Sequence, residues 1–215
     1  MNRTPLAVTL LMLVTAKALA TQPAVMPFQV HAAFFSAETK QTKVIDPQVF
    51  VPDASVQAAT GPQGIKHVTG FRPAMIESDP ATTPLSNADG KPLGFTLGAW
   101  LGASGTVTIS PLKAGGETVS AQFHDLRPNA QYSLFENHFD QTPVGFTPLD
   151  GNGTNNSFQT DANGDASVTV IAPEVLTHSN AILVVYHGDG HTHGVSRGEI
   201  GIGAQHQLIA RIPAD

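Results

Sequence analysis

The chain has 215 residues, of which 13% are charged and 41% hydrophobic, and its net charge is −6. A disordered acidic chain would carry more charge and fewer large apolar residues, so at least one packed core is expected. The chain has no cysteine, which excludes disulfide bonds, cysteine nucleophiles and thiolate-ligated zinc, iron–sulfur or blue-copper centres. Lysine and arginine form no run, so no nucleic acid partner is expected.

Residues 1–20 have the features of a secretory signal peptide in the expected order. Arg3 supplies a positive start, residues 6–14 form a short apolar core, and Ala18 and Ala20 give the small–x–small pattern of a cleavage site. The apolar run is about half as long as a membrane-spanning helix requires, so no membrane span is expected. We therefore predict cleavage before Thr21 and a periplasmic or secreted mature protein.

Residues 21–93 are predicted to form a proline-rich arm. Nine prolines interrupt this region and limit any strand to a short length. Residues 28–35 and 48–51 are candidates for one or two short strands that pair with a sheet edge. The remainder is expected to be irregular chain lying against the following domain, because its phenylalanines are too apolar for a free linker.

Residues 94–215 are predicted to form an all-β domain, an antiparallel β-sandwich. Short β-favouring stretches alternate with glycine-rich turns, and no helical period appears. Residues 181–187 are almost entirely apolar, as in a central strand that is buried on both faces. The predicted strands are residues 95–101, 106–109, 118–124, 131–139, 156–160, 166–171, 181–187 and 205–212.

One local motif resembles a known fold family. Leu126, Pro128 and Tyr132 have the Leu-x-Pro-x-x-x-Tyr spacing of the corner in fibronectin type III domains. In that family the tyrosine hydroxyl bonds to nearby backbone and fixes a turn between the two sheets. The resemblance implies an immunoglobulin-like or fibronectin-like architecture and no particular activity.

The chemically distinctive segment is a histidine-rich loop at residues 186–194. His187, Asp189, His191 and His193 fall within seven residues and are separated mainly by glycines. Neutral imidazole is a common ligand of zinc and copper, and two histidines two residues apart point to the same side of an extended backbone. The glycines allow the chain to fold back. We therefore predict a copper or zinc site at this loop, with His187, His191 and His193 as the favoured ligands.

Other histidines at strand ends are candidates for more distant ligands. His124 and His138 each end a predicted strand. If the strand ending at His138 runs antiparallel to the strand ending at His187, the two histidines lie at opposite ends, and a parallel arrangement would bring them together. Glu199 is a candidate for orienting an imidazole through a hydrogen bond, or for a surface ion pair with Arg197.

The pair His191 and His193 is also similar to the His-x-His pair of copper/zinc superoxide dismutases, which are secreted β-sandwiches. That family's remaining metal ligands and its disulfide cysteines have no counterpart in this sequence. The resemblance therefore does not extend to dismutase activity.

Three hypotheses follow for the function. The first is an exported protein that binds copper or zinc in metal handling, with an affinity that falls as the pH drops through about 6.5 because imidazole protonates. The second is a non-enzymatic recognition module for a glycan or an envelope protein, which an exposed aromatic patch including Trp100 would favour. The third is a metal-dependent oxidoreductase or hydrolase, for which the sequence assigns no catalytic residue.

Overall fold

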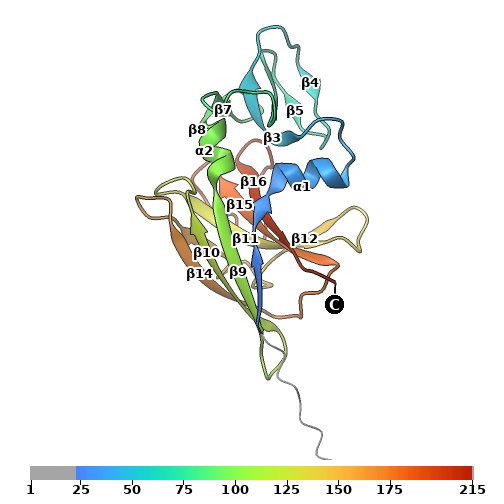
Figure 1. Ribbon diagram of the computed structural model, residues 1–215, viewed down its shortest axis with the longest axis vertical. Helices are drawn as coiled ribbons and strands as arrows, with labels where there is room; N and C mark the ends of the chain where they lie inside the picture. Colours follow the sequence, from blue (N-terminus) through green and yellow to red (C-terminus); the bar gives the residue numbers. More distant parts are fainter. Residues whose placement is uncertain (1–22, 215) are drawn as a thin grey trace, which may run out of the picture.

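Two antiparallel sheets form the predicted β-sandwich in a computed structural model that describes residues 23–214, and the expected signal peptide lies outside these residues (Figure 1). Apolar side chains from both sheets form one core between them. The first sheet has the order β1 (Ala24–Pro27), β9 (Ser104–Pro111), β10 (Glu117–His124) and β14 (Ala166–Ala172). The second has the order β12 (Gly145–Pro148), β11 (Gln131–His138), β15 (Asn180–His187), β16 (Ala204–Arg211) and β2 (Gln29–Val30), with β13 (Ser157–Gln159) also pairing with β11.

Residue alternation explains which face of each sheet is buried. In β10 the side chains of Val119, Ala121 and Phe123 are buried, while the polar residues between them are more exposed. Strand β15 is buried along its whole length, as its composition predicted. A second apolar cluster covers the outer face of this sheet and includes Leu183 and Val185. The second sheet therefore has protein on both faces.

The tyrosine in the Leu-x-Pro motif bridges the turn between β10 and β11. The Tyr132 hydroxyl accepts a hydrogen bond from the backbone N–H of Arg127 at 3.0 Å and donates one to Oε1 of Gln207 at 3.1 Å. Tyr132 is completely buried. This contact ties the link between the first and second sheets to the core.

The proline-rich region contains more regular structure than its sequence indicated. Its strands form a third sheet with the order β6 (Phe71–Met75), β3 (Ile45–Pro52), β7 (Pro84–Ser86) and β8 (Pro92–Thr96), beside the short pair β4 (Ala59–Thr60) and β5 (Lys66–His67). The predicted strand at residues 48–51 lies within β3. The prediction for residues 28–35 holds only in part, because β2 pairs with the edge of the second sheet at β16 and the chain then continues as helix α1 (His31–Glu38).

The predicted strand at residues 95–101 is wrong beyond Thr96, where helix α2 (Leu97–Gly102) begins. The Thr96 hydroxyl accepts a hydrogen bond from the backbone N–H of Ala99, which caps the first turn. Leu97 and Trp100, three residues apart, share the buried face of this helix. The Trp100 indole donates to Oδ2 of Asp46 at 2.9 Å, so the helix also binds β3. No helix within residues 23–214 has the length and apolar character to cross a membrane.

Candidate metal centre

The structure brings three residues of the histidine-rich loop together. His187 ends β15, and Asp189 and His193 lie in the loop that follows. One ligand atom from each residue lies within 4.8 Å of the other two. The closest pair is Nε2 of His193 and Oδ2 of Asp189, at 2.9 Å. Two imidazoles and one carboxylate therefore converge on one point at the end of a rigid strand.

His187 is held in an orientation that suits a metal ligand. Its side chain is 1% exposed, and its Nε2 forms a hydrogen bond with the Ser133 hydroxyl at 2.8 Å. Its Nδ1 is buried and has no hydrogen-bond partner among residues 23–214. Burial, and then the nearby His193, lower the pKa of His187 to about 4, so the imidazole is neutral at pH 7. One ring nitrogen is fixed by a hydrogen bond and the other is free to bind an ion.

Glycines allow the neighbouring segment to approach these ligands closely. A Cβ atom at Gly203 would lie 2.6 Å from Oδ2 of Asp189, and one at Gly198 would lie 2.8 Å from Cδ2 of His193. Gly198 also has a φ of +82°, which other residues rarely adopt. Asp189 is further fixed by a backbone hydrogen bond to Gly203 at 3.1 Å. Residues 198–203 therefore form a wall against which the loop rests.

A cavity of about 460 Å³ opens beside the three residues. Asp189, His193, Glu199 and Lys91 are among its lining residues. Glu199, which the sequence proposed as an orienting partner or as half of a surface pair, thus borders the same space. No ion pair joins it to Arg197 among the described residues. Small molecules and water can reach the site, because Asp189 and His193 are each about one-third exposed.

The remaining predicted ligands lie elsewhere. The ring of His191 is exposed and outside the cluster, although its backbone N–H donates to Oδ1 of Asp189. His124 ends a strand of the other sheet and pairs with Asp165 at 3.0 Å. Because β11 and β15 are antiparallel, His138 lies at the opposite end of the sheet from His187, about 20 Å away.

Sequence reasoning missed a second group of histidines. His31 and His206 lie 4.8 Å apart between ring centroids, and both are almost completely buried. They are separated by most of the chain, so no local motif connects them. The one available signal was the polar run Gln205, His206 and Gln207 inside a strand that is otherwise apolar. Polar residues in a buried strand indicate a polar partner in the interior.

Comparisons with protein-family models, with curated proteins and with solved structures each gave no match. An all-β sandwich alone does not specify a function, because unrelated functions share this architecture. Function must therefore be inferred from the geometry of the described residues.

Proposed function

We propose that this chain is an exported metal-handling protein that binds one zinc or copper(II) ion through His187, Asp189 and His193. The observation that carries the proposal is the convergence of ligand atoms of His187, Asp189 and His193 within 4.8 Å, together with a buried Nδ1 of His187 that has no hydrogen-bond partner among residues 23–214. A buried polar atom without a partner costs free energy, and a bound metal ion would remove that cost.

The ligand types of this site suit both zinc and copper(II), and the ligand atoms must move slightly closer together to bind either ion. Two nitrogen ligands and one oxygen ligand suit zinc and copper(II) better than magnesium or calcium, which prefer oxygen alone. Ligands about 2.1 Å from a tetrahedral ion lie about 3.4 Å from one another. The widest separation of 4.8 Å must therefore close by about 1.4 Å. The loop can supply this movement because His193 and Asp189 are partly exposed.

A metal-dependent oxidoreductase or hydrolase is the second candidate function. Three protein ligands leave a coordination position for water or substrate, as in catalytic zinc sites. The cavity beside His193 provides space at that position, and Glu199 lines it as a candidate proton acceptor. These two observations favour a catalytic role in preference to a closed structural site.

The recognition-module hypothesis loses the feature that would have favoured it. Trp100 is completely buried between Phe95 and Tyr186, so it cannot belong to an exposed aromatic patch. Binding of a glycan or an envelope protein therefore has no specific support in this geometry.

The test is the metal content and metal affinity of untagged protein purified from the cell envelope. We expect about one equivalent of zinc or copper by mass spectrometry. His193→Ala and Asp189→Asn should each weaken binding in calorimetric titration by more than the roughly 10- to 100-fold that loss of an outer partner costs. His124→Ala is the matched control, because it removes another exposed histidine that is paired with an aspartate.

His124→Ala should leave the affinity unchanged. Protein without metal, together with equally weak titration of the parent, His193→Ala and His124→Ala proteins, would contradict the proposal.

A further inference from the structure

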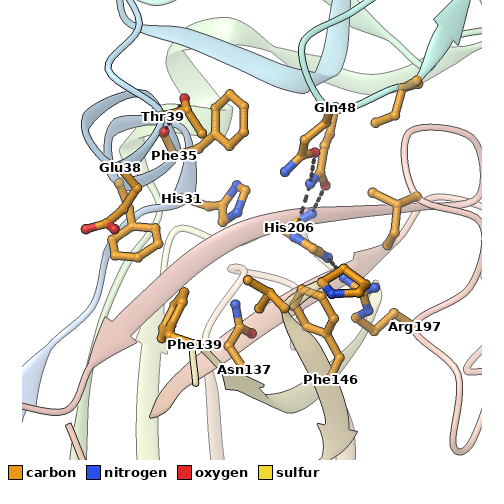
Figure 2. A pocket seen from close by; sticks show the side chains of 16 residues that line it. His31, Phe35, Glu38, Thr39, Gln48, Asn137, Phe139, Phe146, Arg197 and His206 are labelled. Atoms are coloured by element: carbon orange, nitrogen blue, oxygen red, sulfur yellow. Dashed lines mark hydrogen bonds between the residues drawn. The ribbon is translucent and has the colours of Figure 1, made fainter. Parts of the chain in front are cut away.

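A second cavity lies on the outer face of the second sheet, away from the histidine-rich loop. Its volume is about 510 Å³, and it is bordered by α1, β3, β12 and the segment around residues 197–200 (Figure 2). Phe34, Phe35, Phe139 and Phe146 form much of its wall. Its size and aromatic lining are typical of pockets for small organic molecules.

Within the part of the chain that the structure describes, the cavity has one arginine or lysine side chain, and no counter-charge pairs with it. The Arg197 guanidinium is partly buried, and its central carbon lies 3.2 Å from the ring centroid of Phe146. No carboxylate within residues 23–214 forms an ion pair with Arg197. The one acidic residue of the wall, Glu38, is exposed. A cation that is desolvated and unpaired is costly, so an anion is the complementary ligand.

The hydrogen bonds around His206 leave a donor without an acceptor. Nδ1 of His206 faces the Gln48 amide nitrogen at 3.0 Å, and Nε2 faces the Arg197 guanidinium, also at 3.0 Å (Figure 2). The other atoms of the Gln48 amide are occupied, because its oxygen accepts from the His206 backbone and its nitrogen donates to Gln63. A neutral imidazole can accept at only one of its nitrogens. One of these two contacts therefore sets an N–H against another N–H donor, and that donor has no acceptor among residues 23–214.

Two further polar atoms belong to residues of the cavity wall and are buried. Nδ1 of His31 and Oδ1 of Asn137 are buried and have no hydrogen-bond partner among residues 23–214. Both residues are 4% exposed and line the cavity. Native proteins leave few buried polar atoms unsatisfied, so two in one cavity indicate a missing polar ligand.

We propose that this cavity binds a small aromatic monocarboxylate. Its carboxylate accepts hydrogen bonds from the Arg197 guanidinium, and its ring lies among the side chains of Phe34, Phe139 and Phe146. Four phenylalanines supply the apolar and stacking contacts, and a single arginine matches a single negative charge.

This site is separate from the proposed metal centre. Arg197 and His193 belong to the same segment but line different cavities. The carboxylate site requires no metal ion, so metal-free protein can test it. Its failure and the failure of the metal proposal are therefore distinguishable.

The experiment is calorimetric titration of the purified protein, freed of metal by chelation, with cinnamate, its neutral analogue cinnamamide, and butyrate. Cinnamate should bind with one-to-one saturation, and the other two about 10- to 100-fold more weakly, the range expected for loss of a charge-assisted hydrogen bond or of the aromatic contacts. Arg197→Met should weaken cinnamate binding by a similar factor. Lys113→Gln removes an exposed cation in a distant turn and should have no effect.

Stability measurements separate a binding role of Arg197 from a structural one. Arg197→Met should change Tm by only a few degrees, because relief of a desolvated cation that has no ion pair within residues 23–214 offsets the loss of its contacts with His206 and Phe146. Val144→Trp provides a second variant, since Val144 lines the cavity and is 39% exposed, and a larger side chain there fills the space without removing a polar contact. It should abolish cinnamate binding. Absence of saturable cinnamate binding, equal binding of cinnamamide, or unchanged binding in both variants would overturn the proposal.

Discussion

Acid should destabilise this protein through histidines that fold in the neutral form. Burial, and then the nearby charge of Arg197, lower the pKa of His31 to about 3 from the ordinary 6.5. Below pH 6.5 the unfolded chain binds a proton at His31 and the folded chain does not. The contribution of the neutral His31 to the free energy of unfolding is therefore fully present above pH 6.5. It is lost as the pH falls toward 3. Burial also lowers the pKa of His206, so this residue adds to the loss of stability in acid.

The expected size of the His31 effect follows from this pKa. Between pH 7 and pH 5 the unfolded imidazole titrates while the folded one stays neutral, which costs about 2 kcal/mol of unfolding free energy. Burial raises the pKa of Asp46 to about 6, against the effect of its hydrogen bonds, and this carboxyl opposes the loss over the same interval. The total pH dependence is therefore a sum of opposite terms, and a variant is needed to isolate His31.

The variant His31→Leu separates this contribution from those of Asp46, His187 and His206, because these groups remain in both proteins and burial, the largest cause of the lowered pKa of His206, persists in the variant. Leucine keeps an apolar contact with Phe35, on which the imidazole stacks. Urea unfolding at pH 7 and pH 5, with a chelator present, should show that the variant loses about 2 kcal/mol less than the parent over this interval. An identical pH dependence in the two proteins would refute the idea that His31 is neutral when folded.

Two other substitutions test the packing around the sites. Gly203→Ala should push Asp189 away, because a Cβ atom would lie 2.6 Å from its Oδ2, and should weaken metal binding about 10-fold in titration while costing less than about 1 kcal/mol of stability. Unchanged metal affinity would show that Asp189 is not a ligand. Tyr132→Phe removes hydrogen bonds to Arg127 and Gln207, so urea unfolding should show a loss of about 2 kcal/mol. A loss below about 0.5 kcal/mol would show that the tyrosine hydroxyl does not stabilise this turn.

Much of the sandwich could be predicted because its signals are local. Alternation such as Val119, Ala121 and Phe123 identifies a half-buried strand, and the apolar run of β15 identifies a central one. Helix α2 was not predicted, because the local pattern of apolar residues also fits a strand. Phe95, Leu97 and Leu101 fit a period of two, and only the cap at Thr96 and the burial of Trp100 show that a helix begins there.

The sites could be predicted only where their residues are neighbours in sequence. His187, Asp189 and His193 lie in one loop, so their spacing was sufficient to propose a metal ligand set, although not to exclude His191. The aromatic cavity joins His31 to His206, two residues that no spacing rule connects. Its character also depends on the lack of a carboxylate paired with Arg197 in the part of the chain that the structure describes, and this becomes visible only when the neighbours are placed in space.

The way the first described strands pair has a consequence for how the chain reaches its folded state. β1 forms an edge of the first sheet, and β2, two residues later, forms an edge of the second by pairing with β16. The second sheet is therefore completed only when β16 pairs with β2. Strand β16 also covers one edge of β15, the most apolar strand, so β15 is paired on that side by the strand that follows it in the chain. Closing this edge of the second sheet therefore requires a contact between segments distant in sequence, which forms slowly because a long loop must be closed first.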